Sequence, residues 1–346
     1  MAGSRRSRAR PVLAATLIVV AAVASSPGSA WAATPLPAHV YAPYFETWTT
    51  DSLTTVSQQS GVKQFTLAFL ETTSKTSCTL AWNGSRTQTV GSGRYLAEIA
   101  DLRAAGGDVI PSLGGWSADQ GGTEIGDSCK SVSSIVAAYQ ELVTTYGVSR
   151  IDMDIEGRSL TRADGIDRRN QAIKQLQDWA TATGRPLTIS YTLPTSASGL
   201  EPSGLAVLQN AVSNGVRIDL VQPMVFDYYD RTTTDMGAAA ISALQGLHAQ
   251  LHTLLPAKSD AQLWAIEGAT IMNGIDDYPK KTEVTTLADA QRLRDFAVAN
   301  GLGSLSMWAI QRDNGGCPGV GGANDCSGIA QSTWAFSAIL KAFTGS

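Results

Sequence analysis

The sequence predicts an α/β protein of the (β/α)8 TIM-barrel type, folded as a single domain over residues 33–346. Short apolar runs with strand character recur along the chain, and segments with helical periodicity separate them. Gly or Asn marks the end of many of these helical segments. Eight strands that alternate with helices are typical of a closed parallel barrel. Nothing in the composition after residue 32 resembles a linker to a second domain.

The expected elements follow one another in regular order. The strands are predicted at Val40–Phe45, Gln64–Leu70, Asp108–Leu113, Arg150–Ile155, Leu187–Tyr191, Leu220–Phe226, Leu263–Glu267 and Ser304–Ile310. The helices are predicted at Tyr95–Ala105, Ser133–Tyr146, Ala163–Thr183, Gly204–Ser213, Thr234–Leu254, Leu287–Asn300 and Ser332–Ala342. A helix after the first strand is only weakly marked.

Residues 1–32 have the pattern of a secretory signal peptide. An arginine-rich start precedes the apolar run Val12–Ala24, and Ala30-Trp31-Ala32 forms a small-x-small cleavage site. We expect cleavage after Ala32 and a secreted, extracellular protein. A retained membrane anchor is the weaker alternative, because the apolar run is too short to span a bilayer comfortably.

Charge narrows the possible partners. Cleavage removes four arginines and no acidic residue, which takes the formal charge from −4 to −8. An acidic secreted protein is a poor partner for nucleic acid or an anionic membrane surface, so we expect neither. A neutral or partly cationic substrate fits better, and a monomer is the default expectation.

The four cysteines form an even set in a chain that is expected to be exported. Cys78, Cys129, Cys317 and Cys326 therefore predict two disulfides, for which three pairings are possible. We favour Cys78–Cys129, which ties two loops of the N-terminal half together, and Cys317–Cys326, which closes a short loop rich in Gly, Pro and Asp. A nucleophilic cysteine is not expected, because exported thiols oxidise.

The most informative stretch is the acidic strand Arg150–Gly157. Side chains at every second position of a strand share a face, so Asp152, Asp154 and Glu156 point one way and the aliphatic residues between them point the other. In a parallel sheet both faces are covered, so the acids are buried. Adjacent members lie about 7 Å apart. Because like charges at that distance disfavour full ionisation in low dielectric, at least one acid should hold its proton near neutral pH, as a general acid must.

Two other interpretations of the acidic strand are weaker. A solvated edge strand does not explain why all three polar positions are acids. A calcium or magnesium site is disfavoured because strand spacing spreads the carboxylates and no Gly-rich ligand loop accompanies them. We therefore expect no metal and no cofactor. His248 and His252 lie one turn apart on a predicted outer helix, where a solvated face is commoner than a metal site, and Ser–His–Asp hydrolysis has little support.

In such barrels the chemistry lies at the carboxyl ends of the strands. Polar and aromatic residues gather at the predicted ends: Tyr44, Glu46, Ser112, Gly114, Gly115, Trp116, Glu156, Tyr191, Met224, Asp227, Tyr228, Trp308, Gln311 and Asp313.

Four of these segments together resemble glycoside hydrolase family 18, the chitinases and their relatives. The acidic strand resembles that family's D-x-x-D-x-D-x-E signature, and 112–115 resembles its S-x-G-G signature; the match extends to 222–228 and 307–308. Ser149 stands where the long signature has its first Asp, which suggests altered tuning rather than inactivity. Asp227 and Tyr228 follow Phe226, whereas many relatives have M-x-Y-D; the arrangement is closer to M-x-M-D-Y.

The resemblance implies a substrate-assisted retaining mechanism, in which the 2-acetamido oxygen of the substrate is the nucleophile. Glu156, beside flexible Gly157, is the expected general acid. Asp154 is expected to orient the acetamido N–H while Asp152 shares its proton. Asp227 and Tyr228 are expected to hold the acetamido group from the far side.

Aromatic and polar residues are expected to line the substrate groove. Trp308 should floor the cleavage subsite by stacking on the sugar, although a role in the barrel core is the alternative. Further substrate-binding residues are expected at Tyr44, Trp116, Gln222 and Met224. Trp48, Trp82 and Trp116 either extend the groove or have ordinary surface and packing roles.

The expected function is hydrolysis of chitin, a polymer of β-1,4-linked N-acetylglucosamine. Two alternatives remain open. One is an endo-β-N-acetylglucosaminidase that acts on the core of N-glycans. The other is a non-hydrolytic chitin-binding lectin, which is disfavoured because such proteins usually lose the glutamate that is present here as Glu156.

Overall fold

The computed structural model describes residues 1–3 and 36–345. The predicted secretory signal therefore lies almost wholly outside the described residues, as does the expected cleavage point after Ala32. The chain divides into residues 1–30 and 31–346, and every described helix and strand belongs to the second of these units.

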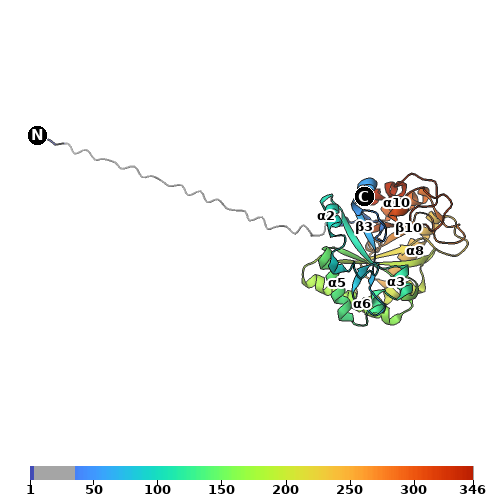
Figure 1. Ribbon diagram of the computed structural model, residues 1–346, viewed down its shortest axis with the longest axis horizontal. Coiled ribbons are helices and arrows are strands. Elements are labelled where there is room, and N and C mark those ends of the chain that lie inside the picture. The colour runs from blue at the N-terminus through green and yellow to red at the C-terminus, as the bar shows by residue number, and fades with distance from the viewer. Residues whose placement is uncertain (4–35, 346) are drawn as a thin grey trace. The chain divides into compact units, whose positions relative to one another are not determined.

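Parallel strands form a barrel at the centre of the fold (Figure 1). Along the sheet their order is β1 (Val40–Tyr41), β13 (Ser304–Trp308), β10 (Gly268–Met272), β9 (Leu220–Met224), β7 (Thr188–Ser196), β6 (Arg150–Asp154), β5 (Asp108–Gly114), β3 (Gln64–Thr72) and β2 (Tyr44–Glu46). Every pairing along this path is parallel.

The first strand closes the barrel. Its halves are β1, which pairs with β13, and β2, which pairs with β3. Pro43 lies between them and has no N–H to donate to a ladder, but its carbonyl accepts the Thr66 N–H at 2.9 Å. Because the two ends of the sheet are consecutive pieces of one expected strand, the sheet joins itself as an eight-stranded barrel. The predicted (β/α)8 fold is confirmed.

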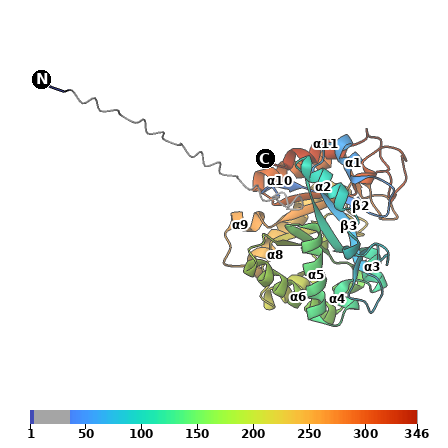
Figure 2. The same cartoon turned by 60° about the vertical axis from the view of Figure 1, so that its left-hand side comes forward.

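Helices surround the barrel (Figures 1 and 2). They are α1 (Leu53–Ser60), α2 (Leu96–Ala104), α3 (Trp116–Gly121), α4 (Ile125–Ser128), α5 (Val132–Tyr146), α6 (Ala163–Ala182), α7 (Pro202–Ser213), α8 (Met236–Leu254), α9 (Asp260–Trp264), α10 (Leu287–Asn300) and α11 (Ala335–Leu340). Most expected helices agree with these bounds to within two residues; the last begins three residues later than predicted. No helix in the described part of the chain has both the length and the apolar character needed to cross a membrane.

Short strands and 3-10 turns lie outside the barrel strands and the main helices. They are the strands β4 (Leu80–Trp82), β8 (Gly199–Leu200), β11 (Gly274–Ile275) and β12 (Val284–Thr285), and the 3-10 turns η1 (Val90–Ser92), η2 (Gly157–Leu160), η3 (Ile310–Arg312) and η4 (Lys341–Phe343). The Lys341 ammonium donates to the Ser60 carbonyl at 2.9 Å, which fastens the end of the chain to α1.

The seventh strand was predicted at the wrong place. Residues 260–264 form α9, and β10 begins only at Gly268, just after the expected strand Leu263–Glu267. Ser259 and Gln262 form a reciprocal capping box that satisfies the first turn of α9. Leu263 is fully buried, but it belongs to a helix. Its apolar side chain therefore packs in the core without forming part of a strand.

Two aromatic residues belong to the packing layer rather than to the barrel mouth. Trp82, considered for the groove, is fully buried and donates its indole N–H to the Tyr146 hydroxyl at 2.9 Å. Tyr191, expected at a strand end, is also fully buried and donates to Asn170 on α6 at 2.9 Å. Both side chains lie between the sheet and the outer helices, so neither can meet a ligand in the barrel mouth.

The favoured disulfide pairing is confirmed: Cys78 is bonded to Cys129, and Cys317 to Cys326. The first bond joins the β3–β4 connection to the residue after α4, and the second closes a loop between η3 and α11.

Candidate active site

A cavity of about 970 Å³ opens at the carboxyl ends of the barrel strands. Of the predicted site residues, it is lined by Tyr44, Trp116, Asp154, Glu156, Met224, Asp227, Tyr228 and Trp308. Asp152 and Gln222 lie behind this wall and are buried. The predicted site residues span more than 260 positions of the sequence. In the structure they therefore meet at one cavity or directly behind its wall.

Asp152 is the buried base of the acidic strand. Its Oδ1 accepts the hydroxyls of Ser190 at 2.6 Å and Thr192 at 2.9 Å. Its Oδ2 accepts those of Ser112 at 2.7 Å and Tyr44 at 3.0 Å. Burial raises the pKa of Asp152, and these hydrogen bonds oppose that shift because they stabilise the charged form. Of the three acids, Asp152 is therefore the one best supported as an anion.

Asp154 has the opposite environment. It is buried above Asp152 and lines the cavity, and its Oδ1 has no hydrogen-bond partner in the described part of the chain. Burial raises the pKa of Asp154 well above its ordinary range, and the nearby Glu156 and Asp152 carboxylates raise it further. These effects favour the protonated form of Asp154, and its Oδ1 remains without a partner next to the cavity.

Glu156 lies just beyond the end of β6, next to the cavity. Its backbone remains extended (φ −134°, ψ 176°), so the alternation of the strand continues and keeps Glu156 on the same face as Asp152 and Asp154. Burial raises the pKa of Glu156 to about 7, and a hydrogen bond from the Trp116 backbone partly offsets the shift. A carboxylic acid that keeps its proton near neutral pH and borders a cavity is suited to general acid catalysis.

Asp119 is a site residue that sequence reasoning missed. It lies on α3, is fully buried, and its Oδ2 accepts the backbone N–H of Glu156 in a short hydrogen bond. Its Oδ1 has no partner among the described residues. Burial raises the pKa of Asp119 well above its ordinary range, and the nearby Glu124 carboxylate raises it further. No motif or spacing distinguishes Asp119 from an ordinary polar residue of a short helix.

Two glycines bring Asp119 to this position. Gly114 and Gly115 have φ values of 104° and 81°, which side-chain-bearing residues rarely adopt. A Cβ on Gly114 would lie 2.1 Å from the Asp154 carbonyl oxygen. The chain can therefore turn from β5 into α3 directly against β6.

The loop after β9 forms the opposite wall. Asp227 has a left-handed backbone (φ 50°); its N–H donates to Asp276 at 3.1 Å, and its Oδ1 accepts the Asp277 N–H at 3.0 Å. Burial raises the pKa of Asp227 to about 8, and Asp276 and Asp277 add to the shift. The Tyr228 N–H donates to Glu283 at 2.7 Å, whereas the Tyr228 hydroxyl is buried with no partner in the described chain. This wall thus presents a free phenol and a carboxyl group that tends to stay neutral.

Aromatic rings form the floor. The Trp308 ring stacks on Phe69 with centroids 5.5 Å apart and planes 11° apart, and it also contacts Tyr44 at 5.5 Å. Trp48 lies 6.0 Å from Trp308 and is 44% exposed, and Trp116 is 60% exposed at the rim. A half-buried indole that presents a flat apolar face to a cavity lined by both aromatic and polar groups suits a pyranose ring, which has one apolar face and a rim of hydroxyls.

Gln222 supports the wall from behind. Its amide nitrogen donates to the Thr270 hydroxyl at 2.8 Å, and Thr270 lines the cavity. Gln222 therefore does not line the cavity itself but supports Thr270, which does.

The expectation of a solvated histidine face on α8 is wrong for His248. Its two ring nitrogens lie 2.7 Å from Glu267 and 2.7 Å from Asp260, and its ring stacks on Trp264 with centroids 3.7 Å apart. The capping box that forms α9 brings Trp264 and Asp260 to this position. Among residues 36–345, no group of three or more His, Cys, Asp or Glu side chains is arranged to hold a metal ion.

Comparison with known proteins gives a consistent result. The family model described as "Glycosyl hydrolases family 18" matches residues 40–293. A probable bifunctional chitinase/lysozyme of Escherichia coli is 34% identical over 332 residues, which are 92% of this chain and 35% of the relative. Endochitinase 11 of Metarhizium anisopliae is 35% identical over 301 residues, which are 83% of this chain and 54% of the relative. The chain thus spans about half or less of the length of these curated relatives.

Among solved structures, the catalytic domain of a hyperthermophilic chitinase from Pyrococcus furiosus is similar over nearly its whole length. The TM-score is 0.80 and the sequence identity 30%, with 91% of this chain and 98% of that chain covered.

Proposed function

Because this chain belongs to glycosyl hydrolase family 18, we propose that it is a secreted chitinase that cleaves β-1,4-linked N-acetylglucosamine polymers by a substrate-assisted retaining mechanism. The observation that carries this function is the difference in environment between three neighbouring acids. Asp152 is stabilised as an anion by four hydroxyl groups, whereas burial favours the protonated forms of Asp154 and Glu156.

The first step is protonation of the glycosidic oxygen by Glu156, which lets the bond to the leaving sugar break. An ordinary retaining enzyme needs a second carboxylate as nucleophile, about 5–5.5 Å from the acid. Asp154 is poorly suited to that role because burial and the neighbouring carboxylates raise its pKa and so disfavour the charged form that a nucleophile needs. The 2-acetamido oxygen of the substrate takes the role instead, attacks the anomeric carbon and forms an oxazolinium-like intermediate. Water then attacks that carbon and returns a proton to Glu156, so the anomeric configuration is retained.

The other wall residues position the acetamido group. The unpartnered Oδ1 of Asp154 accepts the acetamido N–H, and the unpartnered Tyr228 hydroxyl donates to the acetamido carbonyl. Asp227 holds the same group from the far side, next to Tyr228. These contacts hold the internal nucleophile near the anomeric carbon, a kind of positioning that lowers barriers strongly. Trp308 floors the subsite beneath the sugar.

Export is part of the proposed function. Two disulfides fit an oxidising compartment. The mature domain is residues 33–346, so N-terminal sequencing of protein recovered from the medium should begin at Ala33. The mature protein acts as a monomer on its polysaccharide, without nucleic acid, membrane or cofactor.

The function is tested by incubating the protein separately with the N-acetylglucosamine hexamer and with a high-mannose glycoprotein. Shorter chitooligomers should appear first as the β-anomer, and the glycoprotein should keep its glycans. Release of glycans with no cleavage of the hexamer would establish the endo-β-N-acetylglucosaminidase alternative. Binding of the hexamer without new reducing ends would establish the lectin. Equal cleavage of an unsubstituted β-1,4-glucan would contradict substrate assistance, because glucose has no acetamido group.

A further inference from the structure

A short hairpin lies against the wall loop that carries Asp227 and Tyr228. Its strands, β11 and β12, pair antiparallel after β10, and residues 276–283 join them. Asp276 and Glu283 lie at the two ends of this connection, and both side chains are almost fully buried. Neither residue was predicted as part of the site, because acids in a loop are ordinarily exposed.

The two carboxyl groups hold three consecutive residues of the wall loop by their backbones. Glu283 accepts the Tyr228 N–H at 2.7 Å and the Tyr229 N–H at 2.9 Å, one with each carboxyl oxygen. The Oδ2 of Asp276 accepts the Asp227 N–H at 3.1 Å. Asp227 and Tyr229 have left-handed backbones (φ 50° and 54°), so the loop cannot satisfy these N–H groups through a regular helix or sheet.

The contact between the hairpin and the wall loop runs in both directions. The Asp227 Oδ1 accepts the Asp277 N–H at 3.0 Å. The Tyr229 ring packs edge-on against Tyr278, with ring centroids 5.5 Å apart. Asp277 and Tyr229 also line the catalytic cavity. The hairpin and the wall loop therefore form one continuous side of that cavity.

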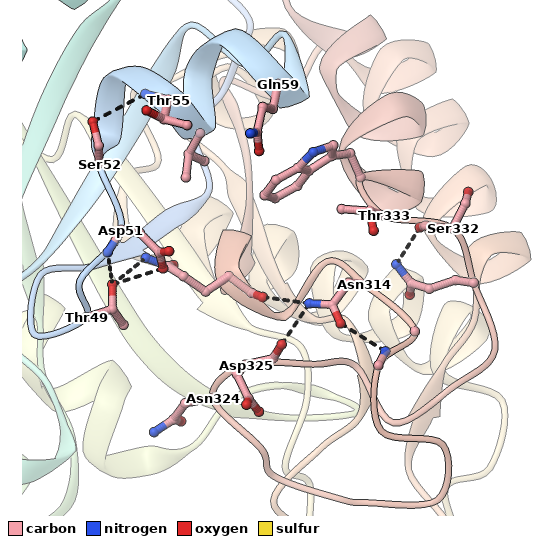
Figure 3. Close-up of a pocket in the computed structure, with 16 residues that line it drawn as sticks. Thr49, Asp51, Ser52, Thr55, Gln59, Asn314, Asn324, Asp325, Ser332 and Thr333 are labelled. Carbon is pink, nitrogen blue, oxygen red and sulfur yellow. Dashed lines mark hydrogen bonds between the residues drawn. The ribbon is translucent and has the colours of Figure 1, made fainter.

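The hairpin is itself braced by another loop. Buried Arg312 donates to the Ile275 carbonyl of β11 at 2.8 Å, and also to the Ala323 carbonyl of the loop that the Cys317–Cys326 disulfide closes. Figure 3 shows Asn324 of this loop beside a second cavity, of about 820 Å³, between α1 and the segment after η3. None of the described hairpin residues lines that second cavity. The hairpin is therefore anchored to a cross-linked loop and borders only the catalytic one of these two cavities.

The environment of the two acids favours retention of a proton. Burial raises the pKa of Glu283 to about 7; the Tyr228 N–H opposes the shift and the Asp276 carboxylate adds to it. Burial also raises the pKa of Asp276, and the N–H groups of Asp227 and Tyr278 oppose that shift. A pair that retains one proton avoids the repulsion between two neighbouring carboxylates and can still accept the N–H groups of the wall loop.

We propose that Glu283, with its partner Asp276, is a positioning residue that fixes the Tyr228 hydroxyl against the substrate. This inference rests on the proposed function, in which Tyr228 and Asp227 hold the acetamido nucleophile. Glu283 does not itself line the catalytic cavity. Its replacement should therefore lower kcat much more than it raises KM, since Trp308 and the rest of the aromatic floor still bind the sugar.

Two buried glutamates provide a matched pair of variants. Glu267 directly precedes β10 and Glu283 lies beyond it, and both side chains are fully buried. In Glu283→Gln an amide N–H₂ replaces one of the two acceptor oxygens and meets a backbone N–H, so one of the two hydrogen bonds is lost. Glu267→Gln makes the same change beside His248, outside the described lining of the catalytic cavity.

The measured quantities are kcat and KM for the N-acetylglucosamine hexamer, with thermal melting of each variant. Glu283→Gln should lower kcat about 10–100-fold and change KM by less than about threefold, whereas Glu267→Gln should keep the wild-type values. In a Tyr228→Phe background, Glu283→Gln should cost only about two- to threefold more, because the hydroxyl that Glu283 positions is already absent. The full loss repeated in that background would mean a general structural role and would overturn the proposal.

Amide hydrogen exchange of the wild-type protein decides the matter if Glu283→Gln melts too low to be assayed. The Tyr228 and Tyr229 N–H groups should be protected about 10²-fold or more, although both lie outside the helices and strands. Unprotected exchange at both would overturn the proposal. Wild-type kinetics in Glu283→Gln would overturn the positioning role alone. A wild-type protein that does not hydrolyse the hexamer would overturn the proposed function, and the positioning role with it.

Discussion

The Asp119 carboxyl group accepts the backbone N–H of Glu156, so the expected acid is fixed in place by a second acid from a different element. Asp119 comes from α3, which follows the glycine pair after β5, whereas Glu156 follows β6. Burial raises the pKa of both side chains. Because burial disfavours the charged form of Asp119, we expect it to support Glu156 more through this hydrogen bond than through its charge.

Two substitutions at Asp119 separate these contributions. Asp119→Asn keeps an acceptor of the same shape and should retain most of the activity. Asp119→Leu leaves the Glu156 N–H buried without a partner and lets Glu156 shift, so kcat should fall about 10–100-fold. The test is kcat with its pH profile for both variants, together with thermal melting. Equal losses in the two variants would show that the charge of Asp119 matters more than its hydrogen bond.

The pH dependence of hydrolysis follows from the pKa of Glu156. The acid must be protonated to act, and burial raises its pKa to about 7. Activity should therefore be retained through mildly acidic pH and decline as the pH rises through about 7. A profile of kcat/KM against pH measures this. A decline already centred near the ordinary glutamate pKa of 4.5 would show that Glu156 is not held in the environment described here.

The aromatic floor should contribute more through Trp308 than through Trp48. Trp308 is stacked on Phe69 at the base of the catalytic cavity, whereas Trp48 is 44% exposed on its rim. Trp308→Ala should weaken binding of the N-acetylglucosamine trimer about tenfold or more, because stacking and apolar burial on a ring are lost together. Trp48→Ala should cost less for this short ligand. Calorimetric titration of inactive Glu156→Gln protein carrying each change gives both values, and an equal loss would contradict the assignment.

Glu46 should make stability depend on pH. It is fully buried, both of its carboxyl oxygens lack partners within the described chain, and burial raises its pKa from 4.5 to about 8, with Arg312 opposing the shift. Because the pKa of Glu46 is higher in the folded state than in the unfolded state, protonation of Glu46 stabilises the fold. That contribution is fully present below about pH 4.5 and is lost as the pH rises through about 8.

Glu46→Gln should remove this dependence because its amide stays neutral. The wild-type Tm minus the variant Tm should decrease by more than about 2 °C between pH 5 and pH 9. Glu141→Gln, an exposed position on α5, is the control. A difference that stays constant with pH would mean that Glu46 does not carry its proton into the fold.

The fold and the catalytic strand could be predicted because their patterns are local and strong. Alternation of acids and aliphatics fixed the face of Asp152 and Asp154, and glycine-ended helical segments indicated most of the helix bounds. The seventh strand was predicted too early in the chain, because the Ser259–Gln262 capping box starts the helix α9 in that apolar stretch. Composition alone cannot distinguish a short buried helix from a strand.

The support of the site could not be predicted in the same way. Asp119 reaches Glu156 only because two glycines turn the chain back on itself, a feature of backbone geometry rather than of residue spacing. Trp82 and Tyr191 are aromatic residues of the kind that could line a binding site, but their side chains point toward the outer helices. The strand register decides whether an isolated aromatic residue faces the inside or the outside of the barrel.

The most direct test is hydrolysis of the N-acetylglucosamine hexamer by the wild type, Glu156→Gln and Glu201→Gln. Glu201 also lines the catalytic cavity but is exposed at the start of α7, so its change alters charge without touching the acid strand. Glu156→Gln should stay folded and lose at least about 10²–10⁴-fold in kcat, the usual contribution of a general acid. Glu201→Gln should remain within a few-fold of the wild type. Substantial turnover by folded Glu156→Gln would show that another group protonates the leaving sugar.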